Sequence, residues 1–241
     1  MSVWAVLVAA GRGERLGEDR PKAFVRLGDL PLLAEPLRRL DESGWIDQIV
    51  LVAPPEWEEP AILLAEEVGA SKVSACVVGG ETRTESVRAG VAEVPEDAAV
   101  ILVHDAARPL VSEDVIARVI AALGEGFDGA VPGLPLTDTV KRTRDGIVVE
   151  TVPRDELVTV QTPQAFVAPV LRAALNGLSV ESTQSSTDCA SLVEAQGGRI
   201  KIVEGDEKLL KVTTRADLER VEAWRYRPSS STSARRSSTR R

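Results

Sequence analysis

The first half of the chain alternates short apolar runs with amphipathic stretches, and this order constrains the fold more than any other feature. Runs rich in valine and isoleucine lie at Val3–Ala9, Ile49–Ala53, Val73–Val78 and Val100–His104. Consecutive apolar positions of this kind are typical of parallel strands buried on both faces. Helical patterns lie between and after these runs, at Leu32–Leu40, Glu58–Val68, Thr84–Ala92 and Glu113–Leu123, the last with Ser112 as a candidate N-cap. The order predicts an α/β fold with a mostly parallel sheet and helices on both faces.

The second half is less regular but continues the same domain. Thr137–Val152 alternates apolar and polar residues around Asp145-Gly146, a hairpin turn signal, which predicts a β-arm over residues 137–153 projecting from the body. We expect further strands at Gly129–Pro132 and Ile200–Val203, and helices at Ala168–Leu175, Ala190–Ala195 and Arg215–Tyr226. One domain therefore covers residues 1–226. Residues 227–241 lack apolar periodicity and form a basic tail that we expect to be disordered and solvated.

Composition excludes several classes of protein. The 44% hydrophobic and 27% charged fractions are ordinary for a globular domain, and no apolar run is long enough to cross a membrane. The N-terminus lacks the basic start of a signal peptide, so we expect a cytoplasmic protein. The net charge of -8 includes the basic tail, so the body is more acidic still and does not suggest nucleic-acid binding. Two cysteines and a single histidine predict reduced thiols and no zinc site.

The loop after the first strand carries glycines and cations together. It runs from Ala9-Ala10-Gly11 through Gly13 to Lys22, and it also contains Arg12 and Arg15. Glycines let backbone N–H groups approach phosphate oxygens, and the added cations favour a triphosphate. The spacing matches neither a P-loop nor the dinucleotide fingerprint, because no Gly-Lys-Ser/Thr follows and the third glycine comes one residue late. A solvated charged loop stays open as the alternative.

Two further loops follow predicted strands, where open α/β sheets bind their ligands. The first, Gly79–Gly90, offers N–H donors at a helix start together with Glu81 and Ser86, although ordinary helix capping explains it equally well from the residues alone. In the second, His104–Pro109, Asp105 could hold Mg²⁺ or a substrate hydroxyl. Arg108 could pair with a phosphate or orient Asp105. For His104 we favour a packing role at the strand end.

These motifs together resemble a known family. Ala-Ala-Gly-x-Gly-x-Arg-Leu followed by Pro-Lys resembles the sugar-phosphate nucleotidyltransferases with a Rossmann-like fold, and Pro-Lys-Ala-Phe is similar to their cytidylyltransferase branch. The His104–Pro109 run resembles the 2-C-methyl-D-erythritol 4-phosphate cytidylyltransferase family of non-mevalonate isoprenoid precursor synthesis. The resemblance spans about residues 3 to 225. Related ribitol 5-phosphate enzymes commonly carry a bulkier residue at the position of Ala107.

The resemblance implies a set of residues that bind the nucleotide and the acceptor. It implies that Arg15, Lys22, Arg154 and Lys211 are catalytic cations. It implies that the substrate-binding residues are Ala9, Ala10, Gly11, Gly13, Gly80, Glu81, Ser86, Asp105, Ala106, Arg108, Thr139, Thr162, Thr187 and Asp188, with Asp105 also as a metal ligand. In the family the arm is exchanged between subunits of a homodimer, which would carry Thr139 and Arg154 into the neighbouring site.

The implied reaction joins CTP to a small polyol phosphate with Mg²⁺ as cofactor. The acceptor phosphate attacks the α-phosphorus of CTP and pyrophosphate leaves. Two positions depart from the family pattern: Cys189 stands where a second acidic residue is usual, and Leu209 where asparagine precedes the Ile-Lys pair. Two alternatives remain, a ribitol 5-phosphate cytidylyltransferase and a non-catalytic nucleotide-binding protein. A dinucleotide-dependent oxidoreductase fails on glycine spacing, and its ribose-binding acidic residue is missing, because the second strand ends in Ala53-Pro54-Pro55.

Overall fold

The computed structural model describes residues 2–11, 19–177 and 188–225. Its centre is an eight-stranded sheet in which β6, β1, β4 and β5 are consecutive neighbours. These strands are β1 (Val3–Val8), β4 (Gln48–Ala53), β5 (Val73–Val78) and β6 (Val100–Asp105). Strand β1 pairs in parallel with both β4 and β6, and β4 pairs in parallel with β5. The predicted parallel core of the sheet is confirmed, and all four strands end at the same edge.

The other half of the sheet is mixed, which the sequence pattern did not predict. Strand β11 (Gln164–Val167) lies antiparallel between β6 and β7 (Gly129–Pro135), and β10 (Val158–Val160) also pairs antiparallel with β7. Strand β12 (Ile200–Glu204) runs parallel to β7. Gly129 and Ala130 pair with both β11 and β12, so these strands lie on opposite edges of β7. The sheet is therefore mostly parallel, with β10 and β11 as the antiparallel exceptions.

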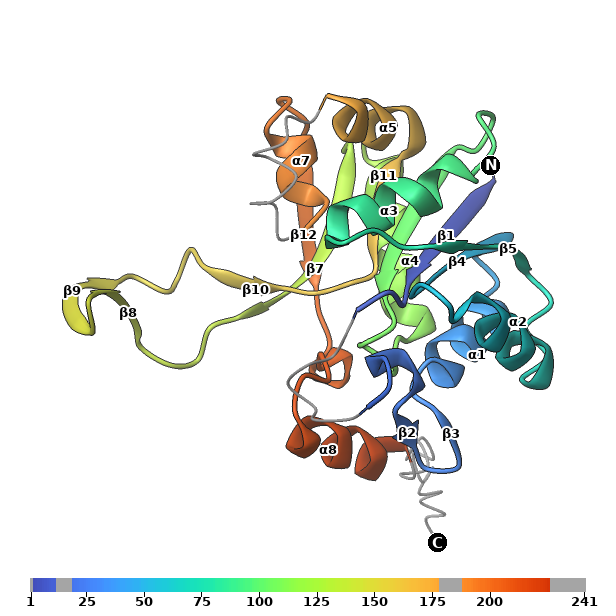
Figure 1. The fold of residues 1–241 in the computed structure, drawn as a ribbon. Helices are drawn as coiled ribbons and strands as arrows, with labels where there is room; N and C mark the ends of the chain where they lie inside the picture. The colour runs from blue at the N-terminus through green and yellow to red at the C-terminus, as the bar shows by residue number, and fades with distance from the viewer. Residues whose placement is uncertain (1, 12–18, 178–187, 226–241) are drawn as a thin grey trace, which may run out of the picture.

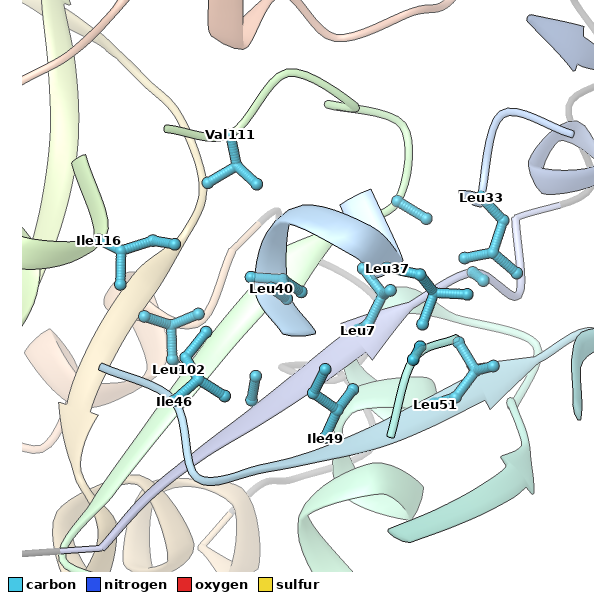
Figure 2. Packing of buried hydrophobic residues seen from close by; sticks show 14 of the residues in the cluster. Leu7, Leu33, Leu37, Leu40, Ile46, Ile49, Leu51, Leu102, Val111 and Ile116 are labelled. Carbon is cyan, nitrogen blue, oxygen red and sulfur yellow. The ribbon is translucent and has the colours of Figure 1, made fainter. Parts of the chain in front are cut away.

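Helices cover both faces of the sheet, as predicted (Figure 1). On one face lie α1 (Ala34–Glu42), α2 (Glu58–Glu67) and α4 (Glu113–Gly124), and on the other α3 (Arg83–Ala92), α5 (Ala168–Asn176) and α7 (Ala190–Glu194). Strand β1 packs into the hydrophobic core on both faces of the sheet. Leu7 lies in the cluster with α1, α2 and α4, and Val6 lies in the cluster with α3, α5 and α7. Side chains alternate across a strand, so an unbroken apolar run is what a doubly covered strand requires. Figure 2 shows Leu7, Ile49 and Leu51 meeting Leu37 of α1.

A smaller hydrophobic cluster packs residues from early in the chain against residues near the C-terminal end of the described chain. Leu27 of β2 (Arg26–Leu27) and Val221 of α8 (Arg215–Arg225) are buried in it together with Val212. Arg225 donates to the carbonyl oxygen of Leu27 at 3.0 Å and pairs with Glu35 at 3.1 Å. The short strands β2 and β3 (Leu30–Pro31) were not predicted. This packing brings the segment after the first loop beside the segment before α8.

The predicted arm is present as a separate two-stranded sheet. Strands β8 (Val140–Arg144) and β9 (Ile147–Val152) pair only with each other within the main-chain ladders of the described residues. Asp145 and Gly146 have φ values of 51° and 77°, the left-handed conformation that a tight hairpin turn requires. Figure 1 shows the arm reaching away from the body. Apolar residues on β9 are exposed, including Ile147 at 70% and Val149 at 54%.

Three smaller expectations had different outcomes. Ser112 occupies the N-cap position of α4, but its side chain makes no capping hydrogen bond. The predicted disordered tail at 227–241 lies outside the described residues. Among the residues that the structure describes, no helix is both long and apolar enough to cross a membrane.

Candidate active site

A pocket of about 720 Å³ opens at the carboxyl edge of the parallel strands. Its walls come largely from the segments that follow β1, β4, β5 and β6, including Ala9, Pro54, Gly79 and Ala106. This is the edge at which open α/β sheets bind ligands, and the volume is ordinary for a small-molecule site. The pocket therefore lies where the sequence predicts the site.

Ten of the residues predicted from the sequence line this pocket. They come from five separate segments and converge only in the folded chain: Ala9, Ala10, Gly11, Lys22, Gly80, Glu81, Ser86, Asp105, Ala106 and Lys211. Gly13, Arg15 and Thr187 lie outside the described residues.

Backbone hydrogen bonds hold the loops after β1 and β5 against the end of β4. The N–H of Ala9 donates to the carbonyl oxygen of Val52 at 2.8 Å, and the N–H of Gly79 donates to that of Ala53 at 2.8 Å. A Cβ atom at Gly79 would overlap the Cβ of Ala10 and would lie 2.8 Å from Oγ of Ser86. Glycine is needed there because the loops after β1 and β5 meet without space for a side chain.

The start of α3 is a capping box. Oγ1 of Thr82 accepts a hydrogen bond from the N–H of Glu85 at 3.1 Å, and Glu85 accepts from the N–H of Thr82 at 3.0 Å. The hydroxyl of Ser86 donates to the carbonyl oxygen of Thr82 at 3.0 Å. The capping interpretation is confirmed, and it does not exclude a binding role. The cap fixes the turn that carries Gly80 and Glu81 along the pocket.

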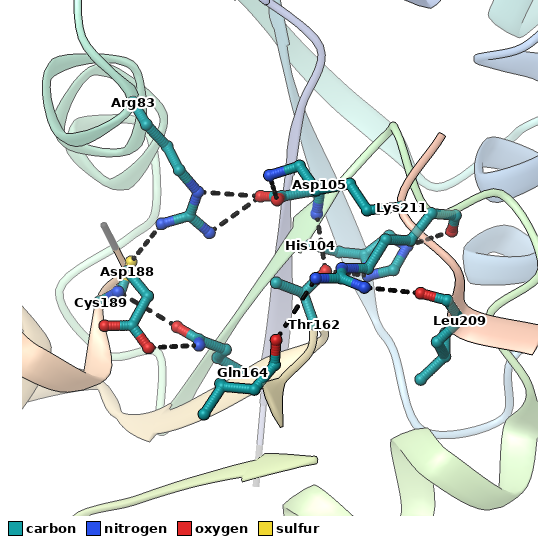
Figure 3. A network of polar contacts seen from close by, with 11 residues as sticks. Arg83, His104, Asp105, Thr162, Gln164, Asp188, Cys189, Leu209 and Lys211 are labelled. Atoms are coloured by element: carbon teal, nitrogen blue, oxygen red, sulfur yellow. Dashed lines mark hydrogen bonds and ion pairs between the residues drawn. The ribbon is translucent and has the colours of Figure 1, made fainter. Parts of the chain in front are cut away.

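Asp105 is the electrostatic centre of the site (Figure 3). Its Oδ1 accepts from Nε of Arg83 at 2.9 Å, and its Oδ2 accepts from Nζ of Lys211 at 2.8 Å. Burial alone would raise the pKa of this carboxyl group, but the attraction of Arg83 and Lys211 outweighs it and holds the pKa well below its usual range. Asp105 is therefore a carboxylate at any working pH, with both oxygens already paired.

A buried chain of hydrogen bonds supports Asp105 from behind. The N–H of Asp105 donates to Oγ1 of Thr162 at 3.1 Å, and Oγ1 lies 3.1 Å from Nδ1 of His104. Nε2 of His104 lies 2.9 Å from the carbonyl oxygen of Arg108, an acceptor only, so we assign the proton to Nε2. Thr162 must then donate to Nδ1. Burial lowers the pKa of His104 to about 4, so the ring is neutral, in keeping with the predicted packing role.

Three predicted substrate-binding residues do not line the pocket. Thr162 is buried with its hydroxyl engaged by Asp105 and His104. Arg108 donates through Nη1 to the carbonyl oxygen of Leu209 at 2.6 Å, which joins the end of β6 to the segment carrying Lys211. Asp188 accepts from Gln164 at 3.0 Å and from the N–H of Ser191 at 3.0 Å. Their predicted contacts with substrate stay predictions.

The two arm residues also lie away from this pocket. Thr139 and Arg154 are exposed and are absent from the pocket lining. Arg154 donates to the carbonyl oxygen of Thr137 at the base of the arm. Within one chain, the arm therefore does not complete the site.

The described residues contain no group of three or more His, Cys, Asp or Glu side chains able to hold a metal ion. Asp105 is the buried carboxylate in the pocket, and both of its oxygens are paired with cations. A divalent cation in this pocket would therefore find one buried carboxylate among the described residues, and most of its ligands would have to come from a bound molecule or water.

Comparison with known proteins identifies the family. The model of the family described as "IspD: 2-C-methyl-D-erythritol 4-phosphate cytidylyltransferase" matches residues 3–226. The chain belongs to this cytidylyltransferase family. The resemblance predicted from the sequence motifs is thereby confirmed, and with it the assignment to the nucleotidyltransferases.

Named relatives agree over nearly the full domain. The chain is 44% identical over 222 residues to the 2-C-methyl-D-erythritol 4-phosphate cytidylyltransferase of Nocardia farcinica, covering 92% of this chain and 93% of that one. It is 45% identical over 222 residues to the enzyme of that name from Rhodococcus jostii, covering 90% and 92%.

Solved structures of the cytidylyltransferase family share the fold. The 4-diphosphocytidyl-2C-methyl-D-erythritol synthase of Anaerococcus prevotii superposes with a TM-score of 0.80 at 27% identity, covering 94% of this chain and 99% of that one. The 2-C-methyl-D-erythritol 4-phosphate cytidylyltransferase of Thermus thermophilus gives 0.72 at 32% identity, covering 93% and 98%. The predicted Rossmann-like α/β fold is confirmed.

Two polar residues in or beside this cytidylyltransferase site were not singled out from the sequence. Arg83 lines the pocket and pairs with Asp105. Gln164 is 1% exposed, and its side chain bridges Asp188 and the N–H of Cys189. Arg83 carried a signal, because it opens the helix after a parallel strand, where ligands bind. Gln164 belongs to the Thr162-Pro163-Gln164 run that resembles a family element, but the resemblance pointed to Thr162 as the binding residue, and the strand that begins at Gln164 was not predicted.

Proposed function

We propose that this chain transfers the cytidylyl group of CTP to 2-C-methyl-D-erythritol 4-phosphate, giving 4-diphosphocytidyl-2-C-methyl-D-erythritol and pyrophosphate. Membership of the family supports the reaction. The structural observation that carries it is the convergence of Lys22, Lys211 and Asp105 on one pocket with the glycine loop after β1. Two lysines that line one pocket suit a site for two phosphorylated substrates, because the combined negative charge of the substrates must be balanced.

The nucleotide side of the pocket is built largely from backbone. We assign the cytosine and ribose to the turn at Gly80 and Glu81, to Ser86, and to Asp105 and Ala106, all of which line the pocket. Polar groups on a capped helix start can recognise a base edge through hydrogen bonds without a charged side chain. Ala10 and Gly11 would bring main-chain N–H groups toward the triphosphate, whereas the N–H of Ala9 is bonded to Val52, so Ala9 would contribute as part of the pocket wall.

The chemistry requires one in-line displacement. An oxygen of the acceptor phosphate forms a bond to the α-phosphorus of CTP, and the bond from that phosphorus to the bridging oxygen breaks, so pyrophosphate leaves. A phosphate monoester is largely ionised near neutral pH, so no general base is needed. We assign Arg15 and Lys22 to the charge that develops on the α-phosphate and the leaving group, and Lys211 with Arg154 of a partner subunit to the attacking phosphate.

Magnesium is part of the proposal. When bound, Mg²⁺ supplies charge neutralisation on the triphosphate. Asp105 is the residue that would hold it, through an oxygen now shared with Lys211 or Arg83. The remaining ligands would be nucleotide oxygens and water, which suits a cation that binds few protein carboxylates.

A homodimer joined through the arm completes the proposal. Thr139 and Arg154 do not line the pocket of their own chain, and β9 exposes Ile147, Val148 and Val149. An exposed apolar hairpin is costly in a monomer and is accounted for by packing on a second copy. The cytoplasmic location stays a prediction from the sequence.

The test is pyrophosphate release from CTP in the presence of Mg²⁺, with one acceptor at a time. We expect release that depends on 2-C-methyl-D-erythritol 4-phosphate. Release that depends only on ribitol 5-phosphate would support the alternative acceptor, for which Ala107, a residue of the pocket wall, is the position to examine. Folded protein that releases none with either acceptor would contradict the proposal and favour the non-catalytic alternative.

A further inference from the structure

Arg83 is held more firmly than the other cation beside Asp105. Its Nε and Nη2 both lie 2.9 Å from Oδ1 of Asp105. Its Nη1 donates to Sγ of Cys189 at 3.4 Å. Cys189 is 1% exposed, so the sulfur belongs to the core of the domain. The guanidinium group is thus fixed between the carboxylate and a buried acceptor (Figure 3).

Lys211 differs from Arg83 in shape and exposure. Its Nζ lies 2.8 Å from Oδ2 of Asp105, and its side chain is 43% exposed, against 21% for Arg83. A lysine ammonium is a point charge on a flexible stem, whereas the arginine fork donates in a fixed plane. Lys211 can therefore turn toward an anion in the pocket, while Arg83 keeps its direction.

A carboxylate as buried as Asp105 needs a cation at all times. Side-chain exposure of Asp105 is 10%, and removing one partner of a buried ion pair is strongly unfavourable. If Lys211 moves to the acceptor phosphate, Arg83 is the charge that stays on Asp105. Without Arg83, Asp105 and Lys211 would pair only with each other, and that pair would oppose the movement of Lys211.

We propose that Arg83 is a positioning residue, which keeps the Asp105 carboxylate aimed into the pocket and so frees Lys211 to bind a substrate phosphate. Cys189 contributes by accepting from the far nitrogen of Arg83. The inference rests on the proposed function, because it assigns Asp105 and Lys211 to the two substrates. It concerns a residue that acts through another rather than by contact with the reacting atoms.

A double-mutant cycle tests this directly. Arg83→Gln is expected to lower kcat/KM for CTP about 10- to 100-fold, the effect of losing a hydrogen bond to a charged group. Arg83→Lys should recover part of that loss. In an Asp105→Asn background, Arg83→Gln should cost nothing further, because no carboxylate remains to be positioned. Calorimetric CTP affinity, measured on the same four proteins, should follow the same pattern.

Controls separate positioning from stability. Arg88→Gln, on the same helix, removes a guanidinium that donates to the carbonyl oxygen of Leu175 at 3.1 Å outside the pocket, and it should leave kcat/KM unchanged. Thermal unfolding of each variant checks the fold. If Arg83→Gln does not fold, the cycle is run with Arg83→Lys.

Additive losses in the cycle would overturn the proposal, since Arg83 would then act independently of Asp105. A wild-type level of activity in Arg83→Gln would overturn it too. If the wild-type protein releases no pyrophosphate, the proposed function fails, and the CTP-affinity cycle still decides the role of Arg83.

Discussion

Lys22 and Lys211 stand near opposite ends of the chain, yet both line one pocket. We predict that Lys22→Ala lowers turnover about 100- to 1000-fold, the usual cost of removing one stabilising group from a charged transition state. The fold should survive, because the change lies in a short 3-10 turn (Lys22–Phe24) at the pocket wall. Steady-state pyrophosphate release measures the effect.

The matched control for Lys22 is Arg26→Ala. Arg26 is an exposed cation four positions along the chain, and it donates to the carbonyl oxygen of Asp29 at 2.9 Å outside the pocket. The Arg26→Ala variant should retain wild-type turnover. Near wild-type turnover in Lys22→Ala would remove Lys22 from the mechanism.

His104 predicts a pH dependence of stability. Its pKa falls from 6.5 to about 4 on folding because the ring is buried. Between these values the unfolded chain binds a proton that the folded chain does not, so the free energy of unfolding falls as pH drops from about 6.5 toward 4. The slope should approach about 1.4 kcal/mol per pH unit. Urea denaturation between pH 7 and 5 measures it.

The chain has a single histidine, which makes this slope easy to assign. His104→Gln should flatten the pH dependence above pH 5, where carboxylates contribute little. An unchanged slope in His104→Gln would show that another group titrates, and would contradict the buried neutral ring.

The sequence alone placed Asp105 correctly at a strand end, but it could not show what surrounds it. Arg83, Thr162 and Lys211 approach Asp105 from segments up to 106 positions away. No local pattern encodes such a meeting, because the sheet topology determines it. Residues whose role depends on their own turn, such as Asp145 and Gly146, could be predicted from the sequence, whereas partners across the fold could not.

At the scale of elements, helix α3 begins with a capping box whose contribution to the free energy of unfolding can be measured. Thr82→Ala removes the side chain that accepts from the N–H of Glu85, and we predict a loss of about 1 kcal/mol in the free energy of unfolding. Ser112→Ala is the matched control. Ser112 occupies the N-cap position of α4 without a capping hydrogen bond, so its replacement should change stability by less than about 0.5 kcal/mol.

Equal losses in Thr82→Ala and Ser112→Ala would contradict the assignment of the cap. Chemical denaturation, with both variants measured in parallel, separates the two outcomes. Thr82 also lines the pocket, so CTP binding is best measured separately from stability.

The elements that were missed share a physical cause. Strand β11 has only four residues, three of them buried, and it enters the sheet directly after Thr162-Pro163. A run this short has too few positions to show a period, and a proline before it suggests a turn. The parallel strands β1, β4 and β6 were found because both of their faces are largely buried, so nearly every position is apolar.

At the scale of the whole molecule, the arm raises a question that one chain cannot answer alone. Thr139 and Arg154 are exposed and are absent from the pocket lining of their own chain. If the arm enters the site of a second copy, each active site takes Lys22 from one subunit and Arg154 from the other. Folding rules for a single chain contain no information on such an exchange, and family resemblance supplied it.

Mixing two inactive variants tests the exchange. Lys22→Ala and Arg154→Ala should each be nearly inactive alone. After subunit exchange, about half the dimers are mixed, and each mixed dimer carries one intact site, so about a quarter of wild-type activity should return. A mixture that stays inactive, although mass spectrometry shows mixed dimers, would mean that each active site takes Lys22 and Arg154 from the same chain, which contradicts the exchange.

The central claim is the transfer of a cytidylyl group to one particular acceptor. The most direct measurement is ³¹P NMR of a reaction containing CTP, Mg²⁺ and equal amounts of 2-C-methyl-D-erythritol 4-phosphate and ribitol 5-phosphate. We predict that the methylerythritol phosphate signal is replaced by the coupled pair of a new diphosphate together with pyrophosphate, while ribitol 5-phosphate persists. Consumption of ribitol 5-phosphate instead, or an unchanged spectrum from folded protein, would contradict the account.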